Sequence, residues 1–253
     1  MNMMLNFKNL TAMKQLLLVG VTAITFFSCR TPTPKNGEEL VKRMHQKYQN
    51  DWYKTLTFKQ ATIYFNQAEE VVKEQTWFEA MKLPNSLAIK FDSVTSGSGI
   101  VFKNDSVSNF KNGLKISTRK FYHPLLILGF SVYAQSPEKT IQDLVNLNID
   151  LSKIETANWQ GKENYIVGNQ KETHFYIEKK RLLFTRMIQY GANGTINETQ
   201  FNKYQPLQNG YISPEVLFLT NGKINMKEVY ENIETPVLNQ KLFDLKWFTK
   251  ASW

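Results

Sequence analysis

The sequence offers little from which a metal centre or a redox centre could be built. It contains one cysteine and three histidines, so no disulfide can form within the chain. His45, His123 and His174 stand far apart, and none has a partner at the spacing of a metal site. A phosphate-binding loop and a dinucleotide-binding glycine motif are also missing. We therefore expect no metal, no cofactor and no enzymatic activity.

Nucleophilic and acid–base catalysis have equally little support. Ser96-Gly97-Ser98-Gly99 lacks the five-residue G-x-S-x-G pattern of a nucleophile elbow, and we interpret it as a turn. The acidic residues are scattered, and no spacing brings two of them together. An envelope hydrolase stays open as an alternative, and it would require paired carboxylates or a Ser-His contact converging in a cleft.

Positive charge is in excess but is not clustered. The chain has 31 Lys and Arg against 22 Asp and Glu, a formal net charge of +9, and its longest basic block is Lys179-Lys180-Arg181. Charge spread in this way is typical of a solvated surface that favours anionic lipid headgroups. A nucleic-acid partner would need a basic stripe, so none is expected.

The most apolar run of the chain ends beside its cysteine. Residues 16–27 form a run of twelve, whereas a helix that crosses a bilayer needs roughly 20 apolar residues. Lys8 and Lys14 precede the run and the small residue Ser28 follows it, which is the order of a secretory signal. We predict that residues 1–28 are a signal peptide, absent from the mature protein.

Phe26-Phe27-Ser28-Cys29 resembles the lipobox of bacterial lipoproteins. The resemblance implies that the chain is cut before Cys29 and that this cysteine carries fatty acyl chains such as palmitate. Several acyl chains, at about 0.8 kcal/mol per buried methylene, make a stable membrane anchor. Residues 29–36 then form the lipidated cysteine and a flexible tether, because Thr31-Pro32-Thr33-Pro34 cannot hold regular structure.

The next segment is predicted to be a helix over residues 37–50. Leu40, Val41, Met44 and Tyr48 recur at the helical period. Acidic residues stand in the first turn and basic residues follow, as the helix dipole favours.

Most of the remaining chain alternates between apolar and polar residues, as residues 87–92 do, and this predicts β-strands. Over residues 56–65 the alternation changes phase, which predicts either a bulge near Lys59-Gln60 or a strand apolar on both faces. The alternation over residues 182–190 places Arg186 on the face of Phe184 and Ile188. The Arg186 side chain then either projects into an apolar cavity or turns outward.

Asn-Gly pairs punctuate the strands, and both residue types tolerate the positive φ of a tight hairpin turn. They occur at Asn112-Gly113, Asn193-Gly194, Asn209-Gly210 and Asn221-Gly222. We therefore predict that consecutive strands are antiparallel neighbours.

One apolar segment interrupts the strands. Residues 123–133 are predicted to form a helix that is apolar nearly all round, which must either be covered on every side or cover something apolar itself. Ser136 and Pro137 then begin a second helix. Its apolar residues are Ile141, Leu144, Val145 and Leu147.

The order of a helix, antiparallel strands, a helical insertion and further hairpins resembles the LolA/LolB family of lipoprotein carriers and receptors. The likeness is carried by residues 37–65 (GEELVKRMHQKYQNDWYKTLTFKQATIYF), 173–190 (THFYIEKKRLLFTRMIQY) and 229–245 (VYENIETPVLNQKLFDL). It implies an α+β fold, in which a curved antiparallel sheet forms an open half-barrel with helices covering its concave face. Residues 37–253 would form this single domain.

The resemblance also implies a function. A LolA/LolB-like domain binds lipid or lipoprotein acyl chains in an apolar cavity, and its partners include a periplasmic carrier protein. Because Cys29 supplies a lipid anchor, the chain looks like the receptor rather than the soluble carrier, and we expect an outer-membrane lipoprotein that faces the periplasm.

The candidate cavity residues are the large apolar side chains of the strands and the insertion, together with one arginine. They are Phe58, Phe91, Leu125, Leu126, Leu128, Phe130, Tyr133, Phe184 and Arg186. The main alternative is a half-barrel plugged by its own helix, which would act as a scaffold or assembly subunit at the outer membrane. A large internal void would separate the two interpretations.

Overall fold

The structure is a computed structural model that describes residues 32–253, the side chain of Ala192 excepted. Pro34–Trp253 form one compact unit. The predicted signal peptide, residues 1–28, and the predicted lipidation site Cys29 lie outside the described residues. Within residues 32–253, no helix is long and apolar enough to cross a membrane.

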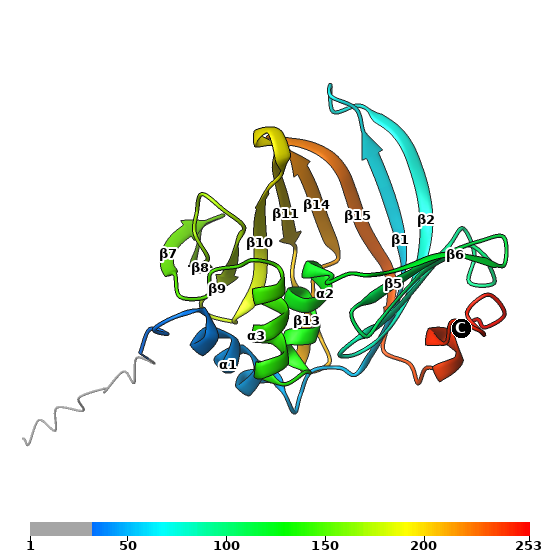
Figure 1. Ribbon diagram of the computed structural model, residues 1–253, viewed down its shortest axis with the longest axis horizontal. Coiled ribbons are helices and arrows are strands. Elements are labelled where there is room, and N and C mark those ends of the chain that lie inside the picture. Colours follow the sequence, from blue (N-terminus) through cyan, green and yellow to red (C-terminus); the bar gives the residue numbers. More distant parts are fainter. Residues whose placement is uncertain (1–31) are drawn as a thin grey trace, which may run out of the picture. The chain divides into compact units, whose positions relative to one another are not determined.

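A single curved sheet of 13 antiparallel strands dominates the fold and does not close on itself (Figure 1). One half contains β1 (Thr55–Phe65), β2 (Val71–Lys82), β3 (Ser86–Phe91), β4 (Gly99–Lys103), β5 (Ser106–Lys111) and β6 (Leu114–Lys120). The other half contains β7 (Ile154–Trp159), β8 (Lys162–Val167), β9 (His174–Glu178), β10 (Leu183–Tyr190), β11 (Ile196–Asn202), β14 (Glu215–Thr220) and β15 (Lys223–Glu234). A separate hairpin joins β12 (Gln205–Leu207) to β13 (Gly210–Ile212). The predicted open half-barrel is confirmed.

The chain starts in the middle of the sheet and returns to it. β1 to β6 run in sequence order to one edge, the helices then cross to the opposite edge at β7, and the later strands lead back to β15, which pairs with β1. The strands at the centre of the sheet therefore come from the two ends of the domain.

The tight turns follow the predicted chemistry. Asn112 and Gly113 have φ values of 51° and 83°, and Asn221 and Gly222 have 50° and 80°, as two-residue hairpin turns require. Asn193-Gly194 also turns with positive φ, between β10 and β11. The fourth turn lies one residue earlier than predicted, at Gln208-Asn209, and Gly210 instead begins β13.

Three α-helices and the first of three 3-10 helices precede or connect the two halves of the sheet within residues 32–253. They are α1 (Gly37–Tyr48), α2 (Pro124–Gly129), η1 (Ser131–Tyr133) and α3 (Pro137–Asn146). α2, η1 and α3 join the two sheet edges and pass over one face, called the inner face below (Figure 1). The apolar insertion thus forms two short helical pieces instead of one helix.

Side-chain caps fix where these helices begin. Asn36 Oδ1 accepts a hydrogen bond from the Glu39 amide at 2.9 Å, and Ser136 Oγ accepts one from the Lys139 amide at 3.3 Å. Val145, one of the apolar residues of α3, is 50% exposed. Leu144 is the buried residue at this level of the helix.

The inner face is densely packed beneath α1 and η1. Trp52 stacks on Tyr133 with ring centroids 3.9 Å apart, and Tyr48 meets both rings edge-on. Gly210 lies against the Trp52 indole, where a Cβ would come within 2.8 Å of the ring. Phe184 is buried in the same cluster.

The opposite, outer face has its own core beneath the C-terminal segment. η3 (Gln240–Phe243) and Phe248 cover Ala88, Val101 and neighbouring side chains. Lys90 is fully buried there, with its Nζ donating to the Ser96 carbonyl at 3.0 Å and lying 5.0 Å from the Phe248 ring centroid. The sheet is thus covered on both faces at β2 to β5.

β10 does not alternate as predicted. Its pairing with β9 shifts register between Phe184 and Arg186, so one residue is skipped. Phe184 and Met187 consequently face the inner core, whereas Ile188 belongs to a small outer cluster. The prediction that Arg186 shares one face with Phe184 is therefore wrong.

Both alternatives predicted for β1 are met in part, because a register shift lies between Thr57 and Lys59 in the pairing with β15, and β1 itself carries apolar residues on both faces. β1 pairs with β2 without interruption from Thr55 to Tyr64, and the extra residue lies in β15 opposite Phe58. Phe58 faces the inner core, and regular alternation then brings Gln60 and Thr62 to the inner face. Two polar residues thus enter an apolar interior.

Candidate ligand-binding site

A cavity of about 340 Å³ lies between α2 and the inner face of the sheet. This volume falls within the range of roughly 300–1,000 Å³ that is usual for small-molecule sites. A neighbouring hollow of about 530 Å³ shares part of its lining with the cavity, namely Phe121, His123, Leu125, Phe218 and Met226.

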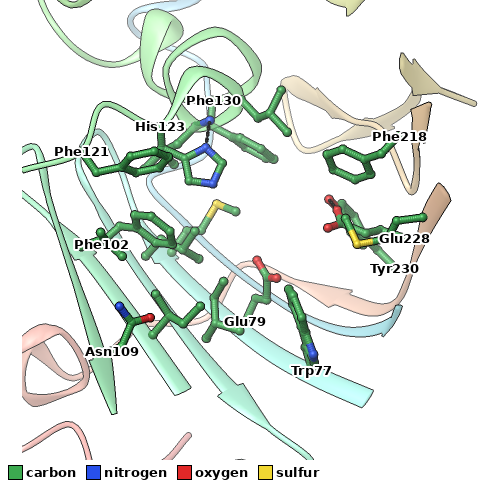
Figure 2. A pocket seen from close by; sticks show the side chains of 18 of the residues that line it. Trp77, Glu79, Phe102, Asn109, Phe121, His123, Phe130, Phe218, Glu228 and Tyr230 are labelled. Carbon is green, nitrogen blue, oxygen red and sulfur yellow. Dashed lines mark hydrogen bonds between the residues drawn. The ribbon is translucent and has the colours of Figure 1, made fainter. Parts of the chain in front are cut away.

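The walls of the cavity are mainly apolar and aromatic (Figure 2). Leu125, Leu126 and Phe130 contribute from α2 and its C-terminal end. Strand residues complete the wall, among them Trp77, Met81, Leu87, Ile89, Ile100, Phe102, Val107 and Phe218. Such a wall suits a hydrocarbon chain, since burial stabilises it by about 25 cal/mol per Å² removed from water.

Two carboxyl groups interrupt this wall. Glu79 projects from β2 and Glu228 from β15, and Figure 2 shows both carboxyls directed into the cavity. β1 lies between the two strands, with Phe58 opposite Glu79 and Thr62 opposite Glu228. The return of β15 to the side of β1 is therefore what brings the two acids onto one face.

Glu79 is a buried acid without a partner. Its side chain is only 5% exposed, and no hydrogen bond or ion pair engages its carboxyl within residues 32–253. Burial raises the pKa of Glu79 well above its ordinary value of 4.5, and the nearby charge of Glu228 raises it further. Such a group is costly to ionise unless a guest supplies the missing interaction.

Glu228 is half-buried and better supported. Burial raises its pKa to about 7, while hydrogen bonds from Tyr230 and Gln60 act in the opposite direction. The Tyr230 hydroxyl donates to Glu228 Oε2 at 2.9 Å. Close to neutral pH, Glu228 is therefore only partly ionised.

Further polar atoms near the acids lack partners. Gln60 Oε1 and Trp77 Nε1 are buried without a hydrogen bond in the described chain. Gln60 lies opposite both Trp77 on β2 and Tyr230 on β15, so these atoms belong to the same part of the inner face. Buried polar atoms of this kind are unusual in a finished core and mark a place where a ligand or water belongs.

Basic groups stand at the other side of the cavity. His123 caps α2 by accepting a hydrogen bond from the Leu126 amide on Nδ1 at 3.3 Å, and burial lowers its pKa to about 4. Arg119 on the edge strand β6 also lines the cavity, is exposed to solvent, and lies over the Phe121 ring at 4.5 Å. His123 is thus neutral at physiological pH, and Arg119 supplies the positive charge of the rim.

The residues predicted for the cavity fall into separate groups. Leu125, Leu126 and Phe130 line it. Phe91 packs on Trp77, with ring centroids 5.3 Å apart, and Phe58 stacks on Tyr230 at 4.1 Å, so both support lining residues. The remaining apolar candidates lie in the filled part of the inner core, namely Leu128, Tyr133 and Phe184.

Arg186 lies on the outer face, away from the cavity. Its Nε and Nη2 donate to the two carboxylate oxygens of Glu198 at 2.7 and 2.9 Å. The guanidinium carbon lies 5.1 Å from the Tyr176 ring and 5.6 Å from that of Trp159. The bidentate pairing with Glu198 and the two flanking rings thus supply partners for the positive charge of Arg186.

The sequence interpretation missed Glu79, Glu228 and Gln60. The available signal was the phase change in β1, which places Gln60 and Thr62 where apolar residues were expected. Met226, Glu228 and Tyr230 repeat the mixture of apolar and polar residues at alternate positions of β15. Neither pattern shows that β1 and β15 are neighbours in the sheet.

An open antiparallel half-barrel with a cavity beneath a helical cover defines the structural class of this chain. No family model matches the sequence, and no curated protein matches it. Solved structures do share the fold. A DUF1329 family protein from Desulfovibrio piger superposes with a TM-score of 0.55 at 15% identity, over 83% of this chain and 96% of the other.

Two further structures are similar to this chain. A LolA superfamily protein from Nitrosomonas europaea matches with a TM-score of 0.52 at 8% identity, over 80% of this chain and 96% of its own. A putative outer membrane lipoprotein-sorting protein domain from Vibrio parahaemolyticus matches with a TM-score of 0.54 at 9% identity, over 82% of this chain and 96% of its own. The chain thus has a LolA-like fold, as its sequence resemblance suggested.

Proposed function

We propose that this protein is a non-enzymatic lipoprotein of the bacterial cell envelope that holds an acyl chain of a lipid or lipoprotein in its cavity. It acts in lipid or lipoprotein sorting, anchored through Cys29 to the outer membrane and facing the periplasm. The observation that carries the proposal is the apolar cavity of about 340 Å³ beneath α2, which the insertion leaves unfilled. The same void argues against the plugged scaffold.

The short helix α2 offers a means of admitting a guest to the cavity. α2 is only six residues long and joins the edge strand β6, and Leu125 at its start is incompletely buried. Because α2 is so short, a small movement of this helix is enough to widen the hollow that borders the cavity.

A neutral alkyl chain tests the proposal directly. Titration of 1-dodecanol into a soluble form of the domain, in which the signal peptide is removed and Cys29 is replaced by serine, should give saturable binding by calorimetry. Leu125→Trp should weaken it at least tenfold, because displacing about two methylene groups from the cavity costs roughly 1.6 kcal/mol.

Val145→Trp is the matched control, since it adds the same side chain at an exposed site on α3. Its affinity should equal that of the unmodified domain. Absence of saturable binding to the unmodified domain, or equal affinities for all three proteins, would refute the proposal.

A hydrolase is the second candidate, because Glu79 and Glu228 converge in the cavity and paired carboxyls can act as acid and base. Their apolar surroundings favour binding instead. Turnover of an acyl ester or a glycoside by the wild-type domain, abolished by Glu79→Gln, would support the hydrolase.

A further inference from the structure

We propose that the guest of this cavity is an amphiphile carrying a protonated amine, and that Glu79 and Glu228 bind its ammonium group while the hydrocarbon lies along the apolar wall. This inference rests on the proposed function and specifies which amphiphile the site selects.

The first argument is the surplus of acceptors. Glu79 offers two carboxyl oxygens that no described residue engages, and Gln60 Oε1 is also unpaired. Glu228 receives a hydrogen bond from Tyr230 and retains further lone pairs. An ammonium group carries three donors and no acceptor, so it complements this set better than a hydroxyl, ester or carboxylate does.

The second argument is charge. A carboxylate or phosphate would be repelled by Glu228 wherever that acid is ionised, and Arg119, the basic residue that lines the cavity within residues 32–253 together with His123, stands on the exposed edge strand. A purely apolar tail would leave Glu79 buried without any partner. A cationic guest avoids this repulsion and also gives Glu79 a partner.

The third argument is the aromatic lining. Trp77, Phe102, Phe218 and Tyr230 present rings to the same space as the acids. Ring faces attract cations, and the attraction is strongest where solvent is excluded. An anion gains nothing comparable from these rings.

Binding should therefore depend on pH in a defined direction. The titratable groups that line the cavity are Glu79, Glu228, Tyr230, His123 and Arg119. Between pH 5.5 and 8, His123 stays neutral because burial lowers its pKa to about 4. Glu228, with a pKa of about 7, changes state in this interval, so affinity for an ammonium should rise with pH.

The experiment compares dodecylamine, dodecanoate and 1-dodecanol, below their micellar concentrations, on the same soluble domain. An alkylammonium, like lysine with a pKa near 10.4, stays charged throughout the range. At pH 8, we expect dodecylamine to bind at least tenfold more tightly than 1-dodecanol, and dodecanoate more weakly than either. The amine-to-alcohol affinity ratio should fall at least threefold at pH 5.5.

Substitutions at the two acids test whether these residues cause the preference for the amine. The double variant Glu79→Gln/Glu228→Gln should bring the amine-to-alcohol ratio close to one, and using a ratio cancels any general change in the cavity. Glu231→Gln is the matched control, because Glu231 lies on the same strand but pairs with Lys59 at 3.2 Å on the surface. It should leave the ratio unchanged.

The outcomes separate the two proposals. Failure of the wild-type domain to bind 1-dodecanol would overturn the proposed function. Binding of 1-dodecanol with no preference for the amine, a preference for dodecanoate, or an amine preference that survives in the double variant would overturn this inference alone.

Discussion

Replacing Trp52 by alanine is expected to lower the free energy of unfolding by about 3–5 kcal/mol, the usual cost of removing a large aromatic side chain from a core. Trp52 is 2% exposed, stacks on Tyr133 with ring centroids 3.9 Å apart, and lies against Gly210. The neighbouring rings of Tyr48 and Tyr133 are fixed to α1 and η1, so they cannot fully close the vacancy. Urea denaturation followed by circular dichroism measures the loss.

Tyr190→Ala provides the comparison, since Tyr190 is 42% exposed at the end of β10. Its substitution should change the unfolding free energy by less than about 1 kcal/mol. Similar losses for the two variants would show that the cluster beneath α1 does not anchor the inner core.

Phe248→Ala should destabilise the domain by a comparable amount, about 3–5 kcal/mol. Phe248 is fully buried, packs on Phe110 with ring centroids 4.7 Å apart, and covers the Lys90 ammonium group. Its removal would create a cavity and would also expose one side of a buried cation that now has a single carbonyl as hydrogen-bond partner.

The adjacent residue is a stringent control. Trp247 is 44% exposed, so Trp247→Ala should cost less than about 1 kcal/mol, although the deleted side chain is larger. The same urea titration distinguishes the two variants. A loss below 1 kcal/mol for Phe248→Ala would mean that the C-terminal segment is dispensable for the sheet.

Local features of this fold could be predicted from the sequence. The first helix, the Asn-Gly hairpins and the helical insertion depend on capping residues, positive φ and periodicity, all of which act over a few neighbouring residues. Ser136 begins α3 and Asn221-Gly222 turns between β14 and β15, as predicted. The resemblance to the LolA/LolB family then supplied the open half-barrel.

Features that depend on pairing between distant strands could not be predicted in this way. Alternation does not reveal a register shift, so Arg186 was assigned to the face of Phe184, whereas the structure pairs it with Glu198 outside. Glu79 and Glu228 lie far apart in the sequence and line one cavity only because β15 returns beside β1. The burial of Lys90 beneath Phe248 is a long-range contact of the same kind.

The phase change in β1 shows how a local irregularity can mark a site. An apolar strand that turns polar residues toward the interior conflicts with the packing of an ordinary core. In this protein, Gln60 and Thr62 are those residues, and the acids of the cavity stand on the strands at either side.

The central claim is that the space beneath α2 accommodates a guest's hydrocarbon chain. Native mass spectrometry of the mature domain, isolated gently from a bacterial envelope extract, tests this claim most directly. We predict that a substantial fraction of the protein carries one lipid-sized adduct, which dissociates as an amphiphile and is reduced in Leu125→Trp. Protein that is free of adduct in repeated gentle preparations, or an adduct unaffected by Leu125→Trp, would contradict the account.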